Sequence, residues 1–299
     1  MAAALPRQVT STRLNRAAYS TKVYHSIIVE TKYQDVENRK NMYKQITFNR
    51  EEIHNAFNAE MIREISEAFQ EIEEECKDTN TILEHPRCVV MTGKGRTFSA
   101  GADLNWMKAM VEYTMEENEA DAGLLFDMMY GIRHCTIPVI SRVNGAALGG
   151  GCGLVASSDI AVGLESCRFG FTEVKLGLIP AVIAPFVIAK IGDHKASRYF
   201  LTGEVFGSRI SRRIGLLHDV VTSEEALDQV KDQVIGHICA SSPAAIRAAK
   251  DLIIKTTSRN GKEEQKAYVC QEIAKIRVSE LGQDGIRAFL HKTSPVWLK

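Results

Sequence analysis

Three short stretches of the sequence bring together residue types that could stabilise and move charge. Residues 145–153 read GAALGGGCG and concentrate four glycines within five positions. The other two stretches are FSAGAD at 98–103 and FGFTEVKLGLIP at 169–180. Glycine adopts unusual backbone dihedrals and lets another group approach the main chain closely. The glycine-rich stretches therefore predict sharp turns, a close approach to the backbone, or both.

Each glycine-rich stretch follows an apolar run that predicts a buried strand, and each precedes a helical pattern. The two strands are expected at 88–92 and 138–143. In open α/β sheets, ligands bind at the carboxyl ends of parallel strands. Free N–H groups at the start of a helix favour an anion or an oxygen that gains negative charge. Because the dinucleotide spacing and a Walker lysine are both absent, a packing corner and an oxyanion hole remain as interpretations.

Glu173 is the candidate acid/base in the third stretch. Its neighbours include Phe169, Phe171 and Val174. A carboxyl group in apolar surroundings has a raised pKa, which suits proton transfer near neutral pH. The alternative is a solvated carboxylate or an ion pair with Lys175.

The elements that must position these stretches alternate between strand and helix patterns. Further strands are expected at 24–31, 43–48 and 160–163, and Asn58 is expected to cap a helix that runs to Cys76. Helical patterns continue at 104–112, 116–134, from the glycine cluster to about 157, and then at 184–192, 195–202, 208–216, 224–240, 243–257 and 262–279. This order predicts an α/β domain with right-handed crossovers and an all-helical C-terminal third.

Charge is unevenly spread along the 299 residues, which hold 37 basic and 37 acidic side chains. The segment 1–29 has four basic residues and no acidic one, a composition typical of a mitochondrial presequence. A disordered tail is the alternative. We therefore expect a mitochondrial matrix protein with a presequence-like segment at 1–29, an α/β core at 30–205 and a helical region at 206–299.

Cysteine, histidine and apolar patterns narrow the class of protein further. The seven cysteines are scattered without a C-x-x-C pair, which is typical of buried thiols in a reducing compartment. The histidines show no metal-ligand spacing, so we expect no metal. No apolar run reaches the roughly 18 residues that span a bilayer, so we expect no membrane partner.

Taken together, these motifs resemble those of the crotonase (enoyl-CoA hydratase/isomerase) superfamily. The markers are N-R-x-x-x-x-N-A at 49–56, F-S-A-G-A-D at 98–103, PVISRVNGAALGGG at 138–151, S-D-I-A-V at 158–162 and F-x-x-x-E-V-x-L-G-L-I-P at 169–180. The resemblance covers about Tyr24 to Lys299 and implies a spiral of repeated ββα turns with a helical C-terminal region. Within the superfamily, GADLNWMK at 101–108 is most similar to methylglutaconyl-CoA hydratases.

The resemblance implies a role for each matching position. The backbone N–H groups of Ala102 and Gly150 would form an oxyanion hole for a thioester carbonyl, with Glu173 as acid/base. The substrate's CoA arm would lie along Ile53, His54, Ala56, Asp103, Leu104, Asn105 and Gly149. Phe289 and Lys292 match the segment that contacts adenine; the alternative for these two is a core aromatic residue and a solvated lysine. No metal or redox cofactor is implied, because coenzyme A is part of the substrate, and a homotrimer or hexamer is expected.

Gly153 departs from the pattern of two-carboxylate hydratases, which have a glutamate at this position. A glycine cannot polarise water, so three explanations stay open. A residue of the helix region with Trp106, Tyr113 and Glu116–Glu119 could hold the water, or a distal carboxylate of the substrate could order it. Glu173 could also move a proton alone, as in Δ3,Δ2-enoyl-CoA isomerases. We expect hydration of a 2-enoyl-CoA, with 3-methylglutaconyl-CoA as substrate, and isomerisation is the alternative.

Other functions and other polar residues receive simpler interpretations. The helix at 58–76 is rich in glutamate and would repel phosphates, which argues against RNA binding. A non-catalytic scaffold is a minor alternative, because Glu173 and both glycine-rich turns are present. Asp103 is expected to cap a helix, Asp159 to be structural, and Cys152 to be a buried thiol.

Overall fold

The computed structural model describes residues 20–37, 39–256 and 261–299. Within these residues, seven strands form a large sheet in the order β1-β2-β3-β4-β6-β8-β11. Their bounds are Thr21–Val23, Ile27–Val36, Arg39–Phe48, Val89–Gly93, Val139–Val143, Ile160–Leu164 and Asp219–Val221. The first three strands pair antiparallel, and the strands from β3 to β11 are parallel. The predicted strands of the α/β core are thereby confirmed.

A second, smaller sheet lies beside the first and has the order β10-β9-β7-β5. Its strands are Phe206–Gly207, Arg168–Gly170, Ala146–Leu148 and Thr97–Ser99. Each of the pairs β4/β5, β6/β7 and β8/β9 sends its first strand to the large sheet and its second to the small one. This is the repeated ββα turn that the family resemblance implies. The small sheet itself was not predicted, because strands of two or three residues are too short to show an alternating pattern.

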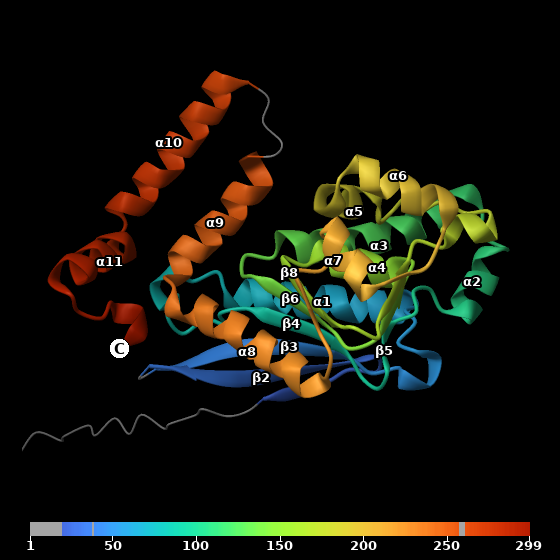
Figure 1. Ribbon diagram of the computed structural model, residues 1–299, viewed down its shortest axis with the longest axis horizontal. Helices are drawn as coiled ribbons and strands as arrows, with labels where there is room; N and C mark the ends of the chain where they lie inside the picture. The colour runs from blue at the N-terminus through green and yellow to red at the C-terminus, as the bar shows by residue number, and fades with distance from the viewer. Residues whose placement is uncertain (1–19, 38, 257–260) are drawn as a thin grey trace, which may run out of the picture.

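Helices cover both faces of the large sheet (Figure 1). The α-helices are α1 Ala59–Glu75, α2 Leu104–Met110, α3 Met115–His134, α4 Gly150–Ser157, α5 Ala184–Ile191, α6 Asp193–Thr202, α7 Ser208–Ile214, α8 Glu224–Ala240, α9 Pro243–Thr256, α10 Lys262–Val278 and α11 Glu280–His291. Short 3-10 helices are η1 Glu51–Ile53, η2 Thr79–Thr81, η3 Glu173–Leu176 and η4 Val296–Leu298. None of the helices among the described residues is both long and apolar enough to cross a bilayer.

Side-chain alternation along β4 divides the interior into two hydrophobic layers. Val89 and Met91 belong to the main core with α1, α3 and α4, whereas Cys88 and Val90 join a smaller cluster with residues of α8. Successive side chains of a strand point to opposite faces, so a strand covered on both sides is apolar at every position. This explains why the continuous run CVVMT predicts a buried strand correctly.

The first long helix follows the predicted pattern closely. The Asn58 side chain accepts a hydrogen bond from the Met61 N–H at 3.0 Å and caps α1. The predicted apolar stripe faces the core, and all of its members are buried: Met61, Ile62, Ile65, Phe69 and Ile72. The cap hydrogen bond and the burial of the apolar stripe both stabilise this helix.

The observed strands bear on the two segment boundaries expected from the sequence, at residues 29 and 205. Thr21 pairs with Glu30, so β1 and β2 extend the large sheet across residue 29, and most of the presequence-like segment expected at 1–29 lies outside the described residues. At the other boundary, two strands follow residue 205. β10 belongs to the small sheet and β11 to the large sheet, so the segment after residue 184 is not all helical. β10 and β11 were not predicted because strands of two and three residues leave no mark on apolar periodicity. The helix α11 was also not predicted as a separate element.

Candidate active site

The first glycine-rich turn presents a free backbone N–H at Ala102. Ala102 forms a parallel bridge with Phe57. The Phe57 N–H donates to the Gly101 carbonyl at 2.8 Å, and the Asp103 N–H donates to the Phe57 carbonyl at 2.9 Å. In this pattern the bridged residue between them directs its own N–H away from the partner strand. The Ala102 N–H is therefore available to a bound group.

The second glycine-rich turn supplies a helix N-terminus directly beside the first turn. Gly150 begins α4, and the N–H groups of a first helical turn have no partner within the helix. Ser99 of β5 pairs with Ala147 of β7. A Cβ placed on Gly101 would lie 2.7 Å from the Leu148 carbonyl oxygen and 3.6 Å from the Gly150 nitrogen. The structure thus brings Ala102 and Gly150 together, and close packing leaves no room for a side chain at the glycine between them.

Glu173 lies next to this pair of turns, at the start of η3. Its Oε1 would be 3.2 Å from a Cβ placed on Gly149, whose φ is +50°. The Oε2 atom is buried and has no hydrogen-bond partner. Burial raises the pKa of the Glu173 carboxyl above its usual value, and a hydrogen bond from its own backbone opposes this. No ion pair between described residues joins Glu173 to Lys175, and Glu173 is half-buried, so its surroundings are those expected of the candidate acid/base.

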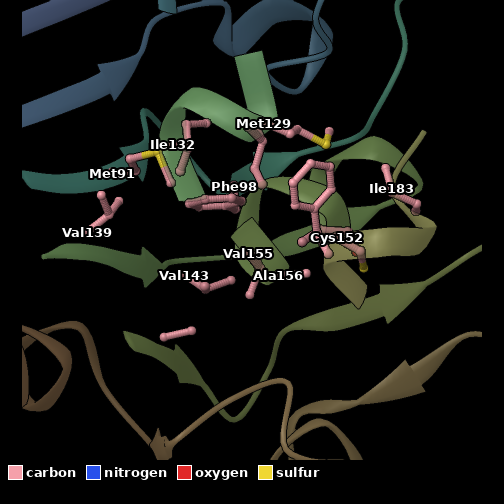
Figure 2. Packing of buried hydrophobic residues seen from close by; sticks show 14 of the residues in the cluster. Met91, Phe98, Met129, Ile132, Val139, Val143, Cys152, Val155, Ala156 and Ile183 are labelled. Atoms are coloured by element: carbon pink, nitrogen blue, oxygen red, sulfur yellow. The ribbon is translucent and has the colours of Figure 1, made fainter. Parts of the chain in front are cut away.

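The position of the absent second carboxylate is filled by apolar side chains. Gly153 is buried, and a Cβ placed there would lie 2.5 Å from Ile183 Cγ2 and 2.7 Å from Met129 Cε. Figure 2 shows Met129 and Ile183 close to the stretch that carries Cys152. The three atoms nearest to that Cβ position all belong to the apolar side chains of Met129 and Ile183. Glu173 therefore has no carboxylate partner at residue 153, because this residue is a glycine and because Met129 and Ile183 occupy the space beside it.

The residues expected along the CoA arm come from two loops that one arginine joins. The Arg50 guanidinium donates to the Ala56 carbonyl at 2.7 Å and to the Asp103 carboxylate at 2.9 Å. Ile53 and the exposed His54 precede Ala56 in this loop, and Leu104 and Asn105 are exposed at the start of α2. The Asp103 carboxylate also accepts from the Asn105 N–H at 2.8 Å, which confirms Asp103 as a helix cap.

Two predicted contact residues lie far from these loops within one chain. Phe289 and Lys292 belong to α11 and its C-cap, and Figure 1 shows α11 at the end of the molecule opposite α2. The Phe289 side chain is 84% exposed, so it is not a core aromatic residue. A single chain therefore does not bring these two residues to the site.

Two other polar residues have structural environments, as expected. The Asp159 carboxylate accepts from the Val139 N–H at 2.7 Å and pairs with Lys250 at 2.7 Å. Cys152 is buried, its thiol donates to the Ala147 carbonyl at 2.9 Å, and burial raises the pKa of that thiol. A thiol that stays protonated is a poor nucleophile.

One polar residue near the site was not singled out from the sequence. Asp121 of α3 accepts a hydrogen bond from the Trp106 indole N–H at 3.2 Å, and burial raises the pKa of its carboxyl. The helical spacing of Asp121, Leu125 and Met129 was the available signal, because i, i+4 and i+8 share one face. The prediction instead named the more N-terminal residues Glu116–Glu119, of which Glu116, Glu117 and Glu119 are exposed.

Comparisons with known proteins agree with this fold. The family described as enoyl-CoA hydratase/isomerase matches residues 38–299. The enoyl-CoA hydratase ACTT6 of Alternaria alternata is 30% identical over 256 residues, which cover 83% of this chain and 81% of that protein. The 2,3-dehydroadipyl-CoA hydratase of Escherichia coli is 31% identical over 251 residues, covering 84% and 92%. The crystal structure of an enoyl-CoA hydratase from Shewanella pealeana superposes with a TM-score of 0.80 at 33% identity, covering 90% of this chain and 95% of that one.

Two sheets built from repeated ββα turns, with two glycine-rich turns side by side, define the crotonase fold. The match over residues 38–299 and the relatives at 30% identity or more then identify the family. The chain belongs to the enoyl-CoA hydratase/isomerase family.

Proposed function

We propose that this chain adds water to a 2-enoyl-CoA thioester and that 3-methylglutaconyl-CoA is its substrate. The observation that carries the proposal is the half-buried Glu173 carboxyl beside the turn that presents the Ala102 and Gly150 N–H groups. Hydration and isomerisation of an enoyl thioester both pass through an enolate. A site of this kind needs donors for the enolate oxygen and one group that transfers a proton to or from carbon.

The chemistry follows from this arrangement. The thioester carbonyl lies between the two N–H groups, so that negative charge on its oxygen is stabilised as the enolate forms. Removing one such donor costs roughly 10²–10³ in rate. Burial raises the pKa of Glu173 and so favours its protonated form, and the protonated carboxyl delivers its proton to the α carbon. Binding of the CoA arm along Ile53–Ala56 and Ala102–Asn105 would hold the acyl group in this geometry.

Two features support a substrate with a second carboxyl group. The segment GADLNWMK at 101–108 is most similar to methylglutaconyl-CoA hydratases. The Escherichia coli relative is named for 2,3-dehydroadipyl-CoA, whose acyl chain also ends in a carboxyl group. We therefore place the chain's activity in the breakdown of leucine or isoprenoids.

The alternative function is Δ3,Δ2-enoyl-CoA isomerisation, and one observation favours it. Met129 and Ile183 fill the space beside Gly153, so Glu173 has no carboxylate partner at the usual position. A single carboxylate suffices to move a proton between two carbons. A non-catalytic scaffold and RNA binding remain weaker alternatives, since the acid/base and both turns are in place.

Assembly and location belong to the same proposal. Val278, Phe289 and Leu290 at the C-terminal end are 78%, 84% and 70% exposed, and packing against a second copy would remove them from water. We propose a homotrimer or hexamer in which α11 approaches a neighbouring site. The acid-free composition of residues 1–29 supports a mitochondrial matrix location.

The test uses the full chain in water enriched in ¹⁸O, with 3-methylglutaconyl-CoA, crotonyl-CoA and a 3-enoyl-CoA as substrates. Mass spectrometry of the products should show a labelled hydroxyl group from 3-methylglutaconyl-CoA. An unlabelled 2-enoyl product from the 3-enoyl substrate alone would favour the isomerase. No product from any of the three would contradict both functions.

A further inference from the structure

The structure places one carboxyl group on the face of α3 that is directed toward the acid/base site. Asp121, Leu125 and Met129 follow each other at i, i+4 and i+8 and therefore share one face of the helix. Met129 reaches the space beside Gly153, and Leu125 packs against the main core. Asp121 is thus on the side of α3 that borders the site, about two helical turns before Met129.

A chain of contacts connects Asp121 to the second glycine-rich turn. A Cβ placed on Gly150 would lie 2.2 Å from Phe57 Cζ, so the Phe57 ring covers this glycine. The Trp106 ring packs edge-on against Phe57 with ring centroids 6.2 Å apart. The Trp106 indole N–H then donates to Asp121 Oδ1 at 3.2 Å. Two aromatic rings therefore link the oxyanion-hole glycine to this carboxyl group.

Asp121 differs from the other acidic residues of α3 in its surroundings. Glu116, Glu117, Glu119 and Asp127 are exposed, whereas Asp121 is half-buried. In the part of the chain that the structure describes, Trp106 is the only hydrogen-bond donor to its side chain, and no ion pair involves it. Burial raises the pKa of its carboxyl, which the Trp106 hydrogen bond opposes. One carboxylate oxygen is thus fixed by the indole, and the other is left for a small polar group.

We propose that Asp121 holds and deprotonates the attacking water, the task that Gly153 cannot perform. This inference rests on the proposed hydratase function. In the step, the Asp121 carboxylate accepts one proton of the water while the water oxygen bonds to the β carbon. The π electrons of the Cα=Cβ bond move toward the thioester, whose oxygen becomes negative beside the Ala102 and Gly150 N–H groups. Protonated Glu173 then delivers its proton to the α carbon, and solvent returns the proton from Asp121 to Glu173.

The Trp106–Asp121 hydrogen bond would also exist if Asp121 only satisfied a buried indole, so the test must separate the two roles. Asp121→Asn keeps an oxygen acceptor for the indole and removes the ability to take up a proton. The matched control is Asp127→Asn, which makes the same change at an exposed position of the same helix. Trp106→Phe removes the hydrogen bond and leaves the carboxyl in place.

Two activities of the full chain are measured for each variant. Hydration is followed with crotonyl-CoA and 3-methylglutaconyl-CoA, and exchange of α protons of butyryl-CoA with D₂O is followed by NMR. Exchange needs Glu173 and the oxyanion hole but no attacking water. We expect Asp121→Asn to lower hydration of both substrates by about 10²–10⁴, the usual contribution of a general base, and to leave exchange unchanged. Trp106→Phe should lower hydration less, and Asp127→Asn should change neither activity.

Three results would overturn the assignment of Asp121. The first is hydration by Asp121→Asn at the unmodified rate. The second is a loss confined to 3-methylglutaconyl-CoA, which would mean that Asp121 recognises the distal carboxyl group. The third is an equal loss of hydration and exchange, which would mean that the change disturbs the whole site. Failure of the proposed function is recognised separately, because the unmodified chain would then hydrate neither substrate.

Discussion

Substitution of Gly153 by alanine tests whether Met129 and Ile183 really occupy the space of the second carboxylate. The added methyl group would lie 2.7 and 2.9 Å from Met129 Cε and Sδ, and 2.5 Å from Ile183 Cγ2. Overpacking of a core typically costs about 1–3 kcal/mol. The change from glycine to alanine inside α4 offsets this by about 1 kcal/mol of helix propensity. Gly153→Ala should therefore lower the free energy of unfolding by about 0–2 kcal/mol.

A double-mutant cycle with Met129→Ala isolates the contact. Met129→Ala removes both Sδ and Cε, so it relieves two of the three close approaches. We expect Gly153→Ala to be less costly in the Met129→Ala background by at least about 0.5 kcal/mol, the lower range for residues in contact. The control is Gly131→Ala in α3, where nothing lies within 4 Å of an added Cβ. That change should raise the free energy of unfolding by about 0.5–1 kcal/mol.

The assay is equilibrium unfolding in urea, followed by far-UV circular dichroism at one protein concentration. If Gly153→Ala costs the same in both backgrounds, Met129 does not fill this space. The reasoning that the site lacks room for a second carboxylate would then be wrong.

Further predictions concern three buried or half-buried charged residues, Glu173, Lys190 and Lys250. Glu173→Gln should abolish turnover and leave CoA-ester binding intact, measured by kinetics and titration calorimetry; an active variant would contradict the role of Glu173. Because burial raises the pKa of Glu173, its ionisation destabilises the fold above the usual carboxyl pKa, so Glu173→Gln should raise the Tm at pH 7 and have little effect near pH 4. Burial lowers the pKa of Lys190 from its usual 10.5 to about 8. Between these two pH values the unfolded chain binds more protons than the folded chain, so the free energy of unfolding should rise with pH. The urea unfolding midpoint of Lys190→Met should not show this rise when it is measured across the same pH range. Lys250→Met would leave the Asp159 carboxylate without the lysine that pairs with it, and should lower the free energy of unfolding by about 3–5 kcal/mol. If Lys250→Met lowers the free energy of unfolding by the same amount in an Asp159→Asn background, the ion pair is not the cause.

The parts of the fold that the sequence predicted correctly are those with long, regular patterns. The helix α1 has both a capping asparagine and a five-residue apolar stripe, and β4 is a continuous apolar run. The strands β5, β7 and β9 have three residues each, so no pattern could indicate them. Their pairing nevertheless brings the two glycine-rich turns together, and that proximity followed from the family resemblance rather than from periodicity.

The parts of the candidate site that could be predicted are those with a local signal in the sequence. Glu173 and the turns at Ala102 and Gly150 could be found because glycine clusters and an acid among aromatics stand out locally. The filling of the Gly153 space could not be found, because Met129 and Ile183 come from separate elements and meet only in the folded core. Asp121 was missed for a similar reason, since its environment depends on a tryptophan from α2.

Both proposed functions require that Glu173 and two backbone N–H groups form and protonate an enolate of an acyl-CoA thioester. Exchange of the α protons of butyryl-CoA with D₂O, measured by NMR, tests this claim without assuming hydration or isomerisation. We expect exchange by the unmodified chain and none by Glu173→Gln. No exchange by the unmodified chain, or equal exchange by both proteins, would contradict it.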